Sequence, residues 1–219
     1  IHFIEAGALL NLFGIVHRDI HQGNILVDDE DVPRIIDFNL AIPVHSVVTD
    51  KKLQHSYNVN TAQEPPDSTL VNAIMLGYNY DRVINSIIDK KAIIKKIRNV
   101  LGVSSEEQRA SLEKFYLESK SVKAGNSALW FSNYWRTIDS WAIGVNIVDL
   151  VSKLSLWPEF VSTLKKNRSK LFPVLKRLCA VSPTRRIDCV QALNYLAPNS
   201  FIIRKYGKPW IAKVGDGGI

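Results

Sequence analysis

The chain has 219 residues, enough for one domain, or most of one, with a sizeable hydrophobic core. Its 46% hydrophobic and 22% charged residues are typical of a globular protein, and no run approaches the roughly 18 apolar residues of a transmembrane helix, so no membrane span is expected. The formal net charge of +7 comes from scattered helical clusters of Lys and Arg without a nucleic-acid-binding motif, so specific binding of nucleic acid is not expected.

The first predicted element is a helix within residues 1–14, because apolar residues recur close to helical spacing and Gly14 provides a stop. A short β-hairpin follows within residues 15–41. Its arms and its acidic turn are expected at Ile25–Val27, Arg34–Ile36 and Asp28–Asp31. Asp19 and Asn24 precede the hairpin and Asp37 follows it, so three oxygen ligands can converge on one point. Such a set suits a hard cation such as Mg²⁺.

Residues 40–67 are polar and irregular, and a loop of this length is usually functional or mobile. Residues 68–134 then predict ordered helices. One helix runs from Ile84 to Leu101, with isoleucines on one side and basic residues, including Lys91, largely on the other. Gly102 ends it, and another helix begins after Ser104 or Ser105 and continues to about Ser119. The basic amphipathic helix from Ile84 to Leu101 could bind a membrane surface or a partner, but we favour packing against its own domain.

A buried helix is predicted from Asp139 to Val151, because this stretch is apolar nearly all round. Two shorter helices are predicted at Phe172–Leu178 and Asp188–Leu196, whereas residues 197–219 have weak periodicity and are expected to be irregular. Cys179 and Cys189 fit neither a disulfide framework nor a zinc spacing. They are interpreted as buried, reduced thiols, which favours an intracellular (cytoplasmic or nuclear) protein.

Several motifs resemble those of the eukaryotic-type protein kinase superfamily. The pattern H-R-D-x-x-x-x-N is met by His17, Arg18, Asp19 and Asn24, and the triplet D-F-G appears as Asp37-Phe38-Asn39, eighteen residues after Asp19. Further along, Pro65-Pro66-Asp67 stands where kinases carry Ala-Pro-Glu. The stretch from Asp139 to Gly144 resembles D-x-W-x-x-G, and Ser182 to Arg186 resembles D-P-x-x-R.

This resemblance implies a mainly α (α+β) fold: a kinase-like large, C-terminal lobe with a short β-hairpin at the catalytic loop. The lobe would span residues 1–196, with a helical insertion at 68–134 and an irregular tail at 197–219. The small N-terminal lobe is absent, since the chain has neither a G-x-G-x-x-G loop before a strand nor a V-A-I-K motif. The chain begins with Ile1 and has no leader, so it is expected to be a piece of a longer product with that lobe upstream.

The resemblance also implies roles for individual residues. Asp19 would be the catalytic base, and Asn24 and Asp37 would hold Mg²⁺ on the phosphates of ATP. His21 stands where Ser/Thr kinases usually have a Lys on the γ-phosphate, and it is a poorer phosphate clamp. Arg18 would pair with a phosphorylated residue of the activation segment, unless it makes a simple ion pair. The candidates for phosphorylation are Thr49, Ser56, Tyr57 and Thr61.

Other residues would support this site. Asp139 would accept backbone N–H bonds from the loop around His17 and Arg18, and Arg186 would pair with Asp67. Phe38 belongs to the same D-F-N triplet. Asn39 replaces the Gly of D-F-G, and Asn tolerates the positive φ that this position often needs.

The expected activity is therefore transfer of the γ-phosphate of ATP to a Ser or Thr of a protein substrate. The isolated chain should transfer little, because half of the nucleotide site is missing. One alternative is a pseudokinase that binds a partner through residues 68–134 and its basic helices. A small-molecule kinase of the same fold is another, favoured by His21 and opposed by Arg18.

Overall fold

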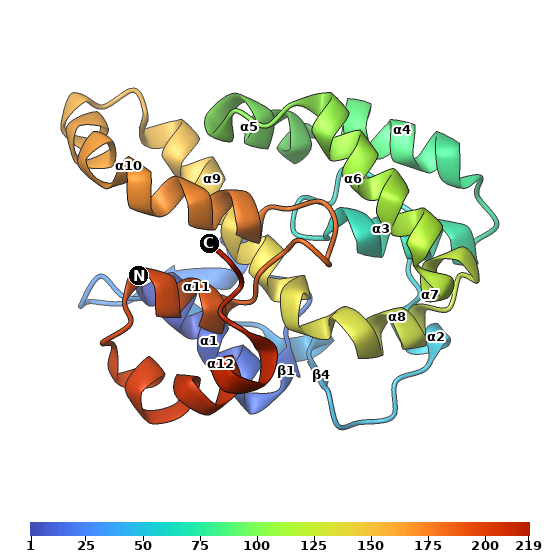
Figure 1. Cartoon of the computed structure of the whole chain (residues 1–219), viewed down its shortest axis with the longest axis horizontal. Coiled ribbons are helices and arrows are strands. Elements are labelled where there is room, and N and C mark those ends of the chain that lie inside the picture. Colours follow the sequence, from blue (N-terminus) through green and yellow to red (C-terminus); the bar gives the residue numbers. More distant parts are fainter.

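The computed structural model describes residues 1–219 and is mainly helical, as predicted (Figure 1). The helices are α1 (His2–Phe13), α2 (Asp50–Leu53), α3 (Pro66–Met75), α4 (Tyr80–Lys90), α5 (Ala92–Leu101), α6 (Ser105–Glu118), α7 (Lys120–Lys123), α8 (Ser127–Tyr134), α9 (Ile138–Leu154), α10 (Pro158–Leu178), α11 (Cys189–Leu196) and α12 (Lys208–Val214). The strands are β1 (Ile15–Val16), β2 (Ile25–Val27), β3 (Pro33–Ile35) and β4 (Ile42–Pro43). None of the helices is long and apolar enough to cross a membrane.

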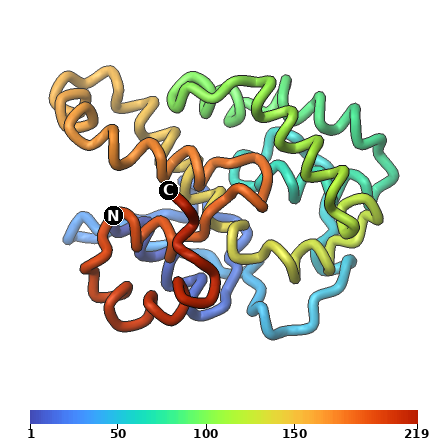
Figure 2. Tube along the Cα trace, viewed as in Figure 1, coloured from blue at the N-terminus to red at the C-terminus, as the bar shows by residue number.

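The first helix ends where the sequence predicts. Gly14 adopts a left-handed conformation (φ 64°), and its N–H bonds the carbonyls of Asn11 and Leu10, which closes the last turn of α1. Helix α1 packs against α11, so Gly7 of α1 lies against Cys189 of α11. The trace in Figure 2 shows the C-terminal stretch returning beside the N-terminal helix.

The predicted hairpin is present, with its second arm shifted by one residue. Strands β2 and β3 pair antiparallel with Ile25 opposite Ile35 and Val27 opposite Pro33, so the second arm is Pro33–Ile35 rather than Arg34–Ile36. Proline can begin a strand at a sheet edge because no partner needs its missing N–H there. A second two-stranded sheet, β1–β4, pairs Ile15 with Pro43 and brings residues 15–16 and 42–43 together.

The predicted helix from Ile84 to Leu101 is two helices, α4 and α5, that meet at Lys91. Their isoleucines are buried, and α5 packs on α9, which confirms packing against the chain's own core. The sequence grouped Lys91 with the basic residues opposite the isoleucines, but this side chain is fully buried in the core, unlike its exposed neighbour Lys90. Gly102 ends α5 in a left-handed conformation and Ser104 caps α6, both as predicted.

Helix α9 lies at the centre of the core, with Trp141, Ile143 and Val148 fully buried, which confirms the predicted buried helix. Helix α11 begins after Asp188, as predicted, and Asp188 and Gln191 form a reciprocal capping box.

Two predictions about the C-terminal part were wrong. The helix expected at Phe172–Leu178 extends back to Pro158. The prediction missed its first half because that half is exposed and Lys-rich and carries little apolar periodicity. Within the tail that was predicted to be irregular, residues 201–214 are largely helical. Tertiary contacts hold this segment: Ile203 is buried, and the Nε1 of Trp210 donates to Oδ2 of Asp188 at 2.9 Å.

Candidate functional site

The loop between β1 and β2 carries five of the predicted site residues: His17, Arg18, Asp19, His21 and Asn24. Asp139, near the start of α9, accepts the backbone N–H groups of His17 at 2.6 Å and Arg18 at 2.9 Å, as predicted. Arg18 has a positive φ of 70°, which is unfavourable for a residue with a Cβ. The two bonds to a buried carboxylate offset this strain and fix the path of the loop into Asp19. Burial raises the pKa of Asp139, and the two N–H bonds oppose that effect.

His17 joins this loop to the segment that carries Asp37. Its imidazole is fully buried. Nδ1 accepts the N–H of Asp19 at 3.3 Å, so the neutral ring carries its proton on Nε2, which lies 3.0 Å from the carbonyl oxygen of Ile36. The ring also meets Phe38 edge to face, with centroids 4.7 Å apart. His17 and Phe38 therefore hold the loop and the D-F-N triplet together.

Both oxygens of the Asp19 carboxylate are engaged. Oδ2 accepts Nδ2 of Asn24 at 3.3 Å and lies 3.6 Å from Nε2 of His21. Oδ1 accepts Nε2 of Gln63 at 2.8 Å. The sequence analysis missed Gln63, because it lies 44 residues further along the chain in an irregular loop that shows no periodic signal.

Asn24 and Asp37 lie close to each other at the base of the hairpin. The N–H of Ile36 donates to the carbonyl of Asn24 at 3.0 Å, so Ile36 lies opposite Asn24. Asp37, the next residue, is therefore close to Asn24. Nδ2 of Asn24 also donates to the Asp19 carbonyl at 3.0 Å, which leaves Oδ1 of Asn24 uncommitted. Asp37 is exposed, and its side chain accepts the N–H of Asn39 at 3.3 Å.

These two side chains fit a Mg²⁺ site that is completed by other ligands. Mg²⁺ in phosphoryl-transfer sites is usually held by one or two side-chain oxygens together with phosphates and water. Asn24 offers a free amide oxygen and Asp37 an exposed carboxylate. The structure contains no group of three or more His, Cys, Asp or Glu side chains that could hold a metal ion by themselves.

The positive φ expected at Asn39 is found at Asp37 instead. Asp37 has φ 61° and ψ 74°, whereas Asn39 lies in a single 3₁₀ turn, Phe38–Leu40. Asn39 therefore does not use the positive φ that it was expected to tolerate. Aspartate tolerates this region better than most residues because its short polar side chain bonds nearby backbone, here the N–H of Asn39.

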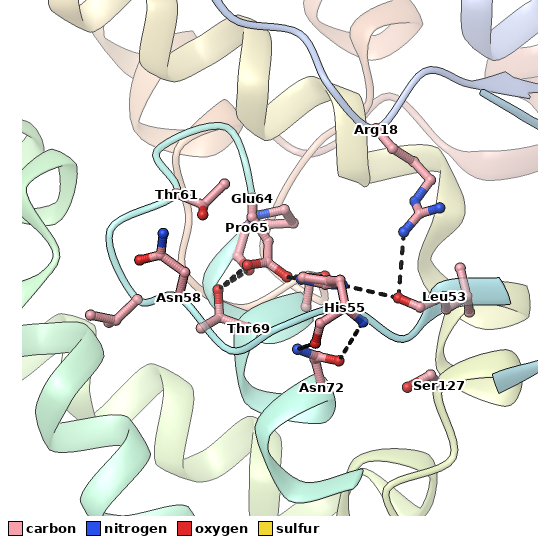
Figure 3. Close-up of polar contacts among 12 residues, drawn as sticks. Arg18, Leu53, His55, Asn58, Thr61, Glu64, Pro65, Thr69, Asn72 and Ser127 are labelled. Carbon is pink, nitrogen blue, oxygen red and sulfur yellow. Dashed lines mark hydrogen bonds and ion pairs between the residues drawn. The ribbon is translucent and has the colours of Figure 1, made fainter. Parts of the chain in front are cut away.

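Arg18 lines a small cavity of about 280 Å³. Figure 3 shows its side chain pointing toward Leu53. Its guanidinium makes a long contact of 3.5 Å with the carbonyl of Leu53, and Lys52 and His55 line the same cavity. Burial lowers the pKa of Arg18, and nearby carboxylates, that of Glu64 foremost, oppose the shift. Arg18 is paired with none of the four residues proposed for phosphorylation.

The segment after α2 is held to α3 around His55, which the sequence analysis also missed. The ring nitrogens of His55 lie 3.0 Å from the carbonyl of Leu53 and 2.8 Å from Oε1 of Glu64 (Figure 3). Both partners are acceptors, so this geometry favours the doubly protonated imidazolium. The bond to Glu64 raises the pKa of His55. Oδ1 of Asn72 accepts the backbone N–H of His55 at 3.4 Å, and Nδ2 of Asn72 donates to the backbone carbonyl of His55 at 3.0 Å.

The predicted pair between Asp67 and Arg186 is present. Nη2 of Arg186 lies 2.6 Å from Oδ1 of Asp67, and both side chains are 0% exposed. Oδ2 of Asp67 accepts the indole N–H of Trp130 at 3.0 Å. The pair fixes the start of α3 against the turn before α11.

One loop and the hairpin that follows it bring together most of the predicted site residues: His17, Arg18, Asp19, His21, Asn24, Asp37 and Phe38. Asp139 supports this loop directly through its bond to the His17 N–H. Asp67 and Arg186 belong to a separate buried pair. The chain matches none of the protein-family models compared with it. No curated protein resembles it at a significant level.

Proposed function

We propose that this chain is the large lobe of a protein-kinase-like phosphotransferase that transfers the γ-phosphate of ATP to a Ser or Thr hydroxyl of a protein. The proposal includes an intracellular location. In this proposal Asp19 is the catalytic base, and Asn24 and Asp37 hold Mg²⁺ on the phosphates.

One observation carries the proposal. The Asn24 carboxamide donates to the carbonyl and the carboxylate of Asp19 and keeps its own oxygen free, and the Asn24 backbone pairs with Ile36, the residue before Asp37. The proposed base and the two proposed cation ligands thus lie around the base of one hairpin, Asp19 and Asn24 before β2 and Asp37 after β3. Phosphoryl transfer depends on such positioning and on charge neutralisation more than on covalent chemistry by the protein.

The support beneath the loop fits the same role. The Asp139 carboxylate fixes the backbone before Asp19, and His17 connects that backbone to the segment carrying Asp37. A base must lie within hydrogen-bond reach of the hydroxyl whose proton it accepts, and a fixed loop provides this geometry. His21, 3.6 Å from Asp19, would stand beside the transferred phosphate and would bind it best when protonated.

The direct test is γ-phosphate transfer by the full-length protein to a panel of Ser, Thr and Tyr peptides, with small alcohols as a second arm. Asp19→Asn should lower the transfer rate by about 10²- to 10⁴-fold, the range typical for loss of a general base. Asp29→Asn, in the exposed hairpin turn, is the matched control and should transfer normally. Equal transfer by the wild type and Asp19→Asn would refute the assigned role.

The metal assignment has its own test. Asn24→Ala and Asp37→Asn should each raise the Mg²⁺ concentration needed for half-maximal transfer, since each removes a proposed ligand. An unchanged Mg²⁺ requirement in both variants would remove the ligand assignment and leave the role of Asp19 intact. Preferential transfer to small alcohols would favour the small-molecule kinase.

A binding module without transferase activity is the second candidate, and one observation favours it. The Asp19 carboxylate is already bonded by Gln63, and the Asp37 carboxylate bonds its own turn. Absence of transfer in the folded full-length protein, together with retention of a partner by residues 68–134, would support this candidate.

A further inference from the structure

The loop before α3 is held by side chains from two distant helical elements. Nζ of Lys91, between α4 and α5, donates to the carbonyl oxygens of Val59 at 3.0 Å and Thr61 at 2.6 Å. The indole N–H of Trp141, in α9, donates to the carbonyl of Ala62 at 2.9 Å. Three of the four carbonyls from residue 59 to residue 62 are therefore bonded by side chains, and Gln63 follows immediately.

Lys91 is an unusual residue for this position. Its side chain is 0% exposed, and its ammonium group is bonded to two neutral carbonyls rather than to a carboxylate. Burial of an ammonium group is unfavourable and is tolerated only when hydrogen bonds compensate for the lost water. Burial lowers the pKa of Lys91 to about 8. An apolar residue would pack between α4 and α5 without this cost, and it would lack the two bonds to the loop.

The consequence lies at Asp19. Because Lys91 and Trp141 fix the backbone up to Ala62, the Gln63 side chain has a defined origin, and its Nε2 reaches Oδ1 of Asp19 at 2.8 Å. Asn24 bonds the other carboxylate oxygen, Oδ2. The two amides together restrict rotation of the carboxylate about its bond to Cβ.

We infer that Lys91 is a positioning residue of the proposed phosphotransferase, acting through Gln63 to set the orientation of the Asp19 carboxylate. The inference rests on the proposed function. It assigns a role to the junction of α4 and α5 within residues 68–134. Lys91 at this junction bonds the loop at residues 59–61, and Gln63 of the same loop bonds the Asp19 carboxylate.

The first test measures steady-state kinetics of the full-length protein. Lys91→Met keeps the side-chain length and removes the donor, and Gln63→Leu removes the amide. Each should lower kcat by about 10-fold or more, because small errors in the position of a reacting group have large effects, and KM for ATP should be unchanged. The double variant should be no slower than the worse single variant, since both changes interrupt one connection. Lys90→Met, at an exposed neighbouring position, is the matched control.

The second test does not depend on transfer. The side-chain NH₂ resonances of Gln63, followed by ¹⁵N NMR in the same protein, should shift in Asp19→Asn because their acceptor changes. The same resonances should shift in Lys91→Met and stay in place in Lys90→Met. Amide hydrogen exchange of residues 59–64 should accelerate in Lys91→Met alone.

The outcomes separate the two ideas. Absence of transfer in the wild type with the NMR shifts present would refute the proposed function and retain the connection from Lys91 to Asp19. Unmoved Gln63 resonances in Lys91→Met, or an increase in kcat in Gln63→Leu, would overturn the inference. If Lys91→Met does not fold, Gln63→Leu decides, because its partly exposed side chain is not part of the core.

Discussion

The buried ion pair between Asp67 and Arg186 gives the sharpest expectation for stability. The substitution Asp67→Asn keeps the shape of the side chain and its bond from Trp130, but it removes the negative charge. The guanidinium of Arg186 would retain its bonds to the carbonyls of Ala180 at 2.8 Å and Thr137 at 3.2 Å, and would lose its only ionic partner.

The magnitude follows from burial. Both side chains are 0% exposed, so water cannot replace the lost carboxylate. Leaving one member of a buried ion pair without its partner costs about 3–5 kcal/mol. The stability of a typical domain is about 5–15 kcal/mol, so this cost amounts to between about one fifth and all of it. Asp67→Glu restores the charge but adds a methylene to a filled site, so it should cost less than Asp67→Asn, about 1–3 kcal/mol.

Urea unfolding, monitored by circular dichroism, measures these differences as shifts in the midpoint at a constant slope. Glu118→Gln is the control, because it breaks a solvent-exposed pair with Lys114 at 3.8 Å, which should contribute about 0.5 kcal/mol or less. If Asp67→Asn destabilises the protein no more than Glu118→Gln, the reasoning about the buried pair is refuted.

Three further expectations follow from single sites. The pKa of His55 is raised, so its pair with Glu64 contributes fully to folding stability below the ordinary pKa of 6.5, and this contribution is lost as the pH rises through the folded-state pKa. Urea titrations should therefore give the wild type an unfolding free energy up to about 1 kcal/mol above that of His55→Gln at low pH, and the two values should converge at high pH. Gly7→Ala should destabilise by about 1–3 kcal/mol in thermal melts, because the new Cβ would lie 2.6 Å from Sγ of Cys189; an increase in melting temperature would contradict this packing. Asp188→Ala removes both the cap of α11 and the acceptor of the Trp210 indole N–H, so it should cost at least about 1–2 kcal/mol, the upper range for a lost cap. Asp216→Ala, in the exposed tail, is the control.

The sequence by itself determined the helical elements that have local signals. Gly14 and Gly102 end their helices because glycine enters the left-handed conformation without a Cβ clash, and Ser104 and Asp188 begin helices because their oxygens bond free N–H groups. These effects act within a few residues.

The sequence also placed Asp19, Asn24 and Asp37 around one hairpin, since fewer than twenty residues connect them. The contacts of Asp139 and Arg186 were predictable only through the resemblance to a kinase family, because over a hundred residues separate them from their partners, and no local rule links residues so far apart.

Tertiary structure alone decided the rest. Lys91 was indistinguishable from its basic neighbours in the sequence, and only the break between α4 and α5, with the loop packed over it, buries the side chain. Gln63 reaches Asp19, and His55 reaches Glu64, because helices from distant parts of the chain hold this loop. The helices at residues 158–170 and 201–214 lack clear amphipathic periods and are fixed by packing at their inner ends. Local patterns describe what each segment prefers, but the burial of a charge depends on what the fold places around it.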